Sequence, residues 1–256
     1  MSTRESRKIE FNELKDLFDK GLWDSLNLSK SELARSMPLT TPFENYSTKI
    51  SIHHESCVKT ICEISEHPLV LVFSSAKNPG GGVANGATAQ EEDLSLCSSW
   101  YFQAGQNKEF YLNSGINATY TDKMLYVSHG LVFKNEHSTF LNTPKPCSFI
   151  GIAAPNINGL SSQKTSIPSF EIKKIVERRI LNLLKFAQQN GHKTLILGAW
   201  GTGVFGLDTQ MVAQIFQTKI EEVNFDGTIH FSIPDTEKYE IFKSTFKQFN
   251  KKIKLT

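Results

Sequence analysis

The residues with the clearest chemical potential are two adjacent carboxylates, Glu91 and Glu92, which follow three consecutive glycines in NPGGGVANGATAQEED, residues 78–93. Seven residues separate GGG from QEE. If a helix begins near Val83, this spacing is about two helical turns and keeps the carboxylates within reach of whatever the glycines bind. Adjacent helical residues point about 100° apart, so at most one carboxylate can face a ligand squarely. The helix dipole also favours acids in a first turn, so a purely structural role stays open.

Two glycine-rich segments each follow an apolar run that is typical of a buried strand. SSAKNPGGGV comes after LVLVF, and GAWGTGVFG comes after TLIL. Glycine lets backbone N–H groups approach a ligand without a Cβ in the way, and a helix N-terminus after the loop favours an anion. Both loops are therefore predicted to bind phosphate, and tight turns without a ligand are the alternative.

The later loop also matches the GxGxxG pattern of nicotinamide dinucleotide sites through Gly201, Gly203 and Gly206, with Glu221 and Glu222 further along the chain. That pattern normally opens the first βαβ unit of a doubly wound sheet. Only about one strand and one helix follow it here. We therefore favour a phosphate loop of another kind over a dinucleotide cofactor site.

The elements that must hold these loops alternate between strands and helices from residue 46 onward. Strands are predicted at 49–52, 69–76, 124–133, 147–156, 194–200 and 228–234, and helices at 55–65, 169–190, 208–223 and 235–249, with helix-compatible residues at 90–102. Gly191 is expected to end the second of these helices and Asp235 to cap the last one. Strands joined by crossover helices predict an α/β fold, a three-layer α/β/α domain with a largely parallel sheet.

Composition and the ends of the chain limit the class of protein. Hydrophobic residues make up 39% and charged residues 21%, and no apolar run reaches the roughly 20 residues that cross a bilayer. Residues 1–45 are predicted to form an N-terminal helical extension with helices at 9–18 and 31–37. The charged N-terminus has no apolar h-region, so we expect a cytoplasmic protein, with export by a dedicated system left open. The basic segment 246–256 is expected to be a solvated helix end, with a place near phosphate as the alternative.

The four cysteines, Cys57, Cys62, Cys97 and Cys147, have neither a CxxC pair nor metal-ligand spacing. They are therefore predicted to be lone buried thiols in a reducing compartment, and no zinc site is expected.

The combination GGG, seven residues and QEE resembles the signature of the bacterial-type poly(ADP-ribose) glycohydrolases, a branch of the macrodomain superfamily. AAPN at 153–156 and LGAWGTGVFG at 197–206 are similar to that branch's other recurrent segments, in the same order and at similar separations. The resemblance covers about residues 45–235 and implies a macrodomain over 46–256 with a central mixed, mostly parallel sheet. The sequence departs from the family where DLSLCSSWYF carries no basic residue, where GTG replaces GCG, and where YVSHG lacks a proline.

The resemblance implies an ADP-ribosyl hydrolase that cleaves a ribose glycosidic bond by general-acid catalysis, with no cofactor and no metal. Glu92 would be the general acid and Glu91 would bind ribose hydroxyls; burial and mutual repulsion would push one of the two carboxyls toward its protonated form. The implied substrate-binding residues are Asn78, Gly80, Gly81, Gly82, Val83, Gln90, Asn156, Gly201, Thr202, Gly203, Val204, Phe205 and Gly206.

Several alternatives stay open at the level of sequence. Phe205 could pack on the distal ribose or be an ordinary core residue, and Asn78 could lie near that ribose or only form a turn before proline. The expected partners are ADP-ribose and ADP-ribosylated protein or nucleic acid, without membrane association, and the chain is expected to be a monomer. Chain trimming and mono(ADP-ribosyl) removal are both compatible with the sequence. A non-catalytic reader of ADP-ribosylated partners is the rival function.

Overall fold

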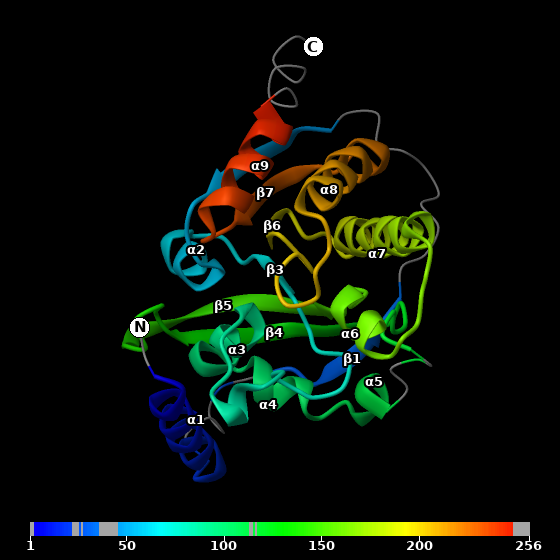
Figure 1. The fold of residues 1–256 in the computed structure, drawn as a ribbon. Coiled ribbons are helices and arrows are strands. Elements are labelled where there is room, and N and C mark those ends of the chain that lie inside the picture. The colour runs from blue at the N-terminus through cyan, green and yellow to red at the C-terminus, as the bar shows by residue number, and fades with distance from the viewer. Residues whose placement is uncertain are drawn as a thin grey trace.

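The computed structural model describes residues 3–21, 26, 28–35, 46–112, 115 and 117–247. These residues build one seven-stranded sheet in the order β1-β4-β5-β3-β6-β7-β2 (Figure 1). The pairs β1–β4 and β4–β5 are antiparallel, and every other neighbouring pair is parallel. The strands are β1 (Ser31–Ala34), β2 (Thr48–His53), β3 (Leu69–Val72), β4 (Met124–Lys134), β5 (Phe140–Ile152), β6 (Thr194–Leu197) and β7 (Gly227–Ser232). The predicted mixed, mostly parallel sheet is confirmed.

Helices cover both faces of the sheet, as β3 illustrates. Its residues are all buried, and they alternate between two hydrophobic clusters: Leu69 and Leu71 belong to one, Val70 and Val72 to the other. A strand with both faces buried reads as a continuous apolar run, which is why LVLV contains no polar residue. The first cluster is closed by α6 (Ile157–Ser162), α7 (Ser169–Gln189), α8 (Thr209–Val223) and α9 (Thr236–Lys247). The second is closed by α1 (Arg4–Asp19), α2 (Cys57–Glu63), α3 (Gln90–Cys97), α4 (Trp100–Ala104) and α5 (Lys108–Leu112). The three-layer α/β/α prediction is confirmed.

The capping residues predicted from the sequence lie at helix boundaries, one at the start of α9 and one after the end of α7. Asp235 Oδ1 accepts a hydrogen bond of 3.0 Å from the Lys238 N–H, in the first turn of α9. Gly191 follows the end of α7 with φ of +72°, the left-handed conformation that glycine adopts without strain. These local predictions are confirmed.

The N-terminal segment is only partly helical. The predicted helix at 9–18 lies within α1, which is confirmed, but the predicted helix at 31–37 is wrong because Ser31–Ala34 form strand β1 beside β4. The unpaired edge of β4 supplies backbone hydrogen bonds that outweigh the helix propensity of Glu32, Leu33 and Ala34. The predicted domain boundary at residue 45 and residues 248–256 of the basic tail lie outside the described residues.

Two other properties follow from the described part of the chain. None of its helices is long and apolar enough to cross a membrane. Its cysteines are free thiols, of which Cys57, Cys97 and Cys147 are buried and Cys62 is half-buried, so the prediction of buried thiols is confirmed for three of them.

Candidate active site

The first glycine loop leaves the carboxyl end of β3 in a conformation that needs glycine. Gly80 and Gly81 have φ of +65° and +61°. A Cβ on Gly80 would lie 2.8 Å from Ser95 Oγ, and a Cβ on Gly81 would lie 2.6 Å from Glu92 Oε1. The missing side chains therefore allow the loop backbone to lie directly against the carboxylate helix.

The path from this loop to α3 differs from the one predicted. Val83–Asn85 form a single 3₁₀ turn that Gly86 ends at φ of +69°, and α3 begins only at Gln90. The condition of a continuous helix from Val83 is therefore not met, because a left-handed glycine interrupts the segment. The predicted proximity nevertheless holds, since the connecting segment folds back on Gly82, whose carbonyl oxygen accepts a 3.2 Å hydrogen bond from the Ala87 N–H.

Glu92 faces the glycine loop. Its side chain is buried, and Oε1 accepts a hydrogen bond of 2.8 Å from the Gly82 N–H. Glu92 is thus a carboxylate held by one backbone donor of the glycine loop, while the neighbouring Gly81 and Val83 N–H groups donate to carbonyl oxygens of the loop itself.

Glu91 points the other way, into the protein. It accepts hydrogen bonds from the Ser75 N–H at 2.6 Å, from Trp100 Nε1 at 3.1 Å and from Ser74 Oγ at 3.3 Å. Burial raises the pKa of the Glu91 carboxyl to about 8, and these donors offset part of that rise. The expected divergence of the two adjacent side chains is confirmed, and the raised pKa falls on Glu91, the deeper of the two.

Gln90 anchors the start of α3 to the end of β3. Its Nε2 donates to the Leu71 carbonyl oxygen at 2.7 Å, and its Oε1 accepts from the Phe73 N–H at 2.9 Å. The amide side chain thereby continues the hydrogen-bonding pattern of a strand, and it fixes where the two glutamates begin. Gln90 also lines the pocket described below, so its predicted contact with substrate stays a prediction.

The second glycine loop follows β6, the neighbour of β3, at the same edge of the sheet. Gly201 and Gly206 have φ of +76° and +74°, and a Cβ on Gly201 would lie 2.7 Å from Ala154 Cβ. The loop is tied to the AAPN segment because the Ile157 N–H donates to the Phe205 carbonyl oxygen at 2.8 Å. Asn156 caps α6, accepting a 2.7 Å hydrogen bond from the Gly159 N–H. Two of the segments that carry the sequence resemblance are therefore in direct contact.

Phe205 lies half-buried at the edge of this loop. It packs against the first hydrophobic cluster, and its ring centroid is 6.1 Å from that of Tyr120. The Tyr120 segment is held by the buried Arg179, whose guanidinium donates to the carbonyl oxygens of Thr119, Tyr120 and Ala153 at 2.7–3.1 Å and to Asp122 Oδ1 at 2.9 Å. Phe205 therefore belongs partly to the core, and part of its side chain stays exposed, so both interpretations of its role remain open.

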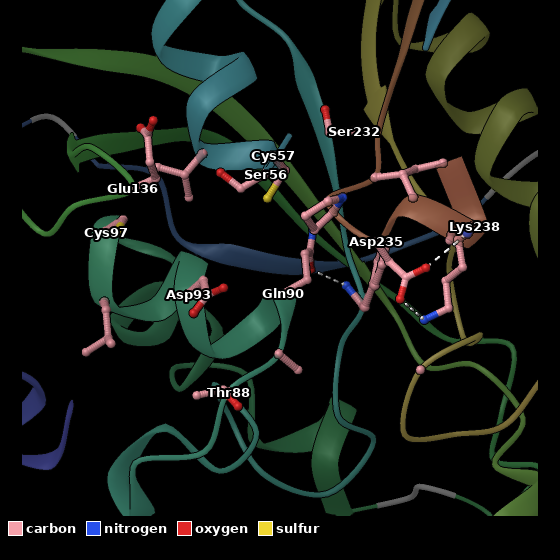
Figure 2. A pocket seen from close by; sticks show the side chains of 18 of the residues that line it. Ser56, Cys57, Thr88, Gln90, Asp93, Cys97, Glu136, Ser232, Asp235 and Lys238 are labelled. Atoms are coloured by element: carbon pink, nitrogen blue, oxygen red, sulfur yellow. Dashed lines mark hydrogen bonds and ion pairs between the residues drawn. The ribbon is translucent and has the colours of Figure 1, made fainter. Parts of the chain in front are cut away.

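A pocket of about 1070 Å³ runs along the sheet edge beside α3 (Figure 2). Glu91, Glu92 and the GGG residues are not among its lining residues, although Gln90 and Asp93, the neighbours of the two glutamates in α3, are. Its volume is at the upper end of the range for small-molecule sites. The lining includes Ser56, Cys57, Phe73, Thr88, Gln90, Asp93, Thr202, Gly203, Val204, Ile233, Pro234, Asp235 and Lys238.

The sequence analysis did not identify the pocket walls that the β2–α2 and β7–α9 connections form. They follow parallel strands at the edge where both glycine loops lie, and that position is the signal that could have identified them. Cys57 on this wall is not a nucleophile at neutral pH, because burial raises the pKa of its thiol to about 12.

The remaining predicted residues have diverse environments. Asn78 is exposed, and its carbonyl oxygen accepts from the Gly81 N–H at 3.0 Å, as in a turn. Val83 is buried in the second hydrophobic cluster, and Thr202 Oγ1 donates to the Ala199 carbonyl oxygen at 2.8 Å. A Cβ on Gly203 would meet no atom within 4 Å, so nothing within the described residues requires glycine there.

Comparison with known proteins is consistent with this geometry. Residues 20–135 match the family model of the microbial-type PARG catalytic domain. Poly(ADP-ribose) glycohydrolase from Thermomonospora curvata, in a structure bound to the inhibitor ADP-HPD, is similar with a TM-score of 0.80 and 24% identity, covering 94% of this chain and 100% of that one. The enzyme from Deinococcus radiodurans in complex with ADP-ribose is similar with a TM-score of 0.75 and 26% identity, covering 80% and 86%. The search of curated proteins found no significant match.

Proposed function

We propose that this chain, a microbial-type poly(ADP-ribose) glycohydrolase by its family match and its fold, is a hydrolase that releases ADP-ribose from poly- or mono-ADP-ribosylated targets. The observation that carries the proposal is the contact of 2.8 Å between the buried Glu92 carboxylate and the amide of Gly82. It joins an acid to the first glycine loop, at the edge of the sheet where the second glycine loop also lies.

In the proposed complex, the nucleotide lies across the carboxyl edge of the sheet. The base and its ribose occupy the pocket, and backbone N–H groups of the two glycine loops surround the pyrophosphate, so few cations are needed. Gly203 supports this arrangement because its missing side chain serves no internal contact. The distal ribose then lies between Phe205 and Glu92.

Cleavage needs a proton on the leaving oxygen, because the transition state resembles an oxocarbenium ion. Glu92 donates that proton as the bond between the anomeric carbon and the leaving oxygen breaks. A water molecule then adds to the anomeric carbon and returns its proton to Glu92. Glu91 fixes the helix through Ser75 and Trp100, and we retain its contact with the ribose hydroxyls as part of the proposal.

The rival function, a reader that binds without cleaving, is separated from the enzyme by one isosteric variant. Glu92→Gln should lower ADP-ribose release from modified protein by about 10²-fold or more, whereas calorimetry with free ADP-ribose should give nearly the wild-type Kd. Glu221→Gln is the matched control, since Glu221 matters only if GxGxxG binds a dinucleotide. Full turnover by Glu92→Gln would refute the acid assignment, and a wild type that binds ADP-ribose but releases none would be a reader.

The same assay addresses substrate preference. Poly-ADP-ribosylated and mono-ADP-ribosylated proteins are incubated separately with the enzyme, and the loss of label from each is followed. Loss from the polymer alone indicates chain trimming, and loss from the mono-modified protein indicates removal of the last unit.

A further inference from the structure

Helix α1 lies against the segment that connects the first glycine loop to α3. Arg4 Nε donates to the Asn85 carbonyl oxygen at 2.8 Å, and Arg7 Nε donates to the Ala87 carbonyl oxygen at 3.1 Å. A Cβ on Gly86 would overlap the carbonyl oxygen of Arg4, so the approach of the two backbones requires glycine at this position. A helix distant in sequence therefore shapes the connection between the proposed phosphate loop and the proposed acid.

Arg7 also reaches α3 itself. Its Nη2 donates to Asp93 Oδ1 at 2.8 Å, and the arginine side chain is only 13% exposed. Asp93 is the residue directly after Glu92. One guanidinium thus joins the connecting segment to the helix that carries the acid, and its planar, multiply donating shape suits this better than a lysine would.

These contacts close a ring around Glu92. Gly82 donates its N–H to Glu92, and its carbonyl oxygen accepts from the Ala87 N–H. The Ala87 carbonyl oxygen accepts from Arg7, which bonds to Asp93, the covalent neighbour of Glu92. Ala89, the N-cap residue of α3, makes no side-chain capping bond, so the first turn of α3 is joined to the connecting segment through this ring and not through a cap side chain.

The part of α1 that carries Arg7 is itself held firmly against the rest of the protein. Phe11 and Leu14 on the same helix are buried, and Phe11 packs edge-on against Tyr101 with ring centroids 4.8 Å apart. The nearly buried ion pair of Glu10 and Lys134, at 2.9 Å, holds the next part of α1 to β4. Arg7 therefore extends from a rigid support, which a positioning residue needs.

We propose that Arg7 is a positioning residue for the reaction, which holds the Glu92 carboxylate in register with the first glycine loop. The inference rests on the proposed function and extends it to a residue about 85 positions away in the chain. A positioning role acts on the reactive geometry, whereas an ordinary surface ion pair contributes little beyond a small change in stability.

The test compares two variants that each remove one cation of an ion pair from α1. Arg7→Gln should lower kcat for ADP-ribose release by about 10- to 100-fold, a larger factor than its effect on the Kd for ADP-ribose, to which Arg7 can contribute because it also lines the pocket. Lys15→Gln removes the exposed pair with Asp19 and should leave kcat unchanged. The Tm values of both variants should be similar, and Arg7→Lys should recover only part of the activity.

Asp93→Asn examines the same bridge from the other side and leaves every contact of α1 with the core in place. It should reproduce the loss in kcat, and the double variant with Arg7→Gln should lose little more than either single one. The inference is overturned if both single variants keep kcat within twofold of wild type, or if kcat and Kd change by the same factor. Absence of turnover by the wild type would instead refute the proposed function.

Discussion

Gly81→Ala tests the claim that the glycine loop exists to let a backbone lie against the acid. The new Cβ would lie 2.6 Å from Glu92 Oε1 and 3.1 Å from Glu91 Oε2, at a residue whose φ is +61°. A left-handed conformation costs an alanine about 1–2 kcal/mol. The unfolding free energy should therefore fall by at least that amount, because the buried Glu92 carboxylate must also give up its hydrogen bond to Gly82 when it moves aside.

The catalytic cost should be larger. Ordinary contact begins near 3.4 Å, so Glu92 Oε1 must move by about 0.8 Å, the difference between 3.4 and 2.6 Å, and its hydrogen bond to Gly82 is lost. A misplacement of about 1 Å at a reactive group costs roughly 10²-fold in rate. We expect kcat for ADP-ribose release to fall by about that factor.

Gly203→Ala is the matched control in the second loop. Its Cβ meets no protein atom within 4 Å and its φ is not left-handed, so the free energy of unfolding should stay within about 0.5 kcal/mol of wild type. Because it would obstruct the pyrophosphate, it should weaken ADP-ribose binding by about tenfold.

Urea unfolding, calorimetry with ADP-ribose and initial rates of ADP-ribose release measure the three quantities for both variants. Unchanged kcat in Gly81→Ala would refute the reasoning, since the displaced carboxylate would then have no part in the reaction. Unchanged Kd in Gly203→Ala would remove the second loop from the binding site.

Two further predictions concern stability. Glu91 is protonated in both states below its ordinary pKa of 4.5, and only the folded state keeps the proton up to about 8, so its contribution to the unfolding free energy is present below pH 4.5 and is lost as the pH rises to about 8. Glu91→Gln should remove this decline from urea midpoints measured across that range; an identical pH profile would contradict the raised pKa. Arg179→Met should lower the unfolding free energy by about 3–5 kcal/mol, because the carbonyl oxygens of Ala153 and Thr119 and the Asp122 carboxylate lose a buried donor. The half-exposed Arg178→Met should cost about 1 kcal/mol or less, and equal losses in the two variants would refute the role of the buried guanidinium.

The parts of the fold that could be predicted are those in which local pattern and tertiary environment agree. In α7, the apolar positions recur at helical spacing, and Ile172, Val176, Ile180 and Leu184 are all buried. In β3, four consecutive apolar residues match a strand covered on both faces. The relation between GGG and QEE could also be predicted, because the two segments are close in sequence and their contact is short in range.

The parts that could not be predicted depend on contacts distant in sequence. Strand β1 has the composition of a helix, and only the edge of β4 makes it a strand. Arg179 interrupts the apolar face of α7. Its charge can be buried there because Asp122 and three backbone carbonyl oxygens accept hydrogen bonds from the guanidinium. In the sequence, Arg7 is one more charged residue of an amphipathic helix. Only the fold brings Ala87 and Asp93 within hydrogen-bonding distance of it.

The unfavourable features of the described chain concentrate around Glu92, and this distribution argues for catalysis independently of family likeness. Two adjacent carboxylates are buried in one helical turn, and Gly80, Gly81 and Gly86 adopt left-handed backbone conformations in the eleven residues before them. Burial of a carboxyl group costs free energy, and glycine loses more conformational freedom on folding than other residues do. A reader of ADP-ribose would need the amides of the two loops but not a buried glutamate against one of them. A sequence retains such locally costly choices where function requires them, and here they meet at a buried carboxylate that accepts a hydrogen bond from the first glycine loop.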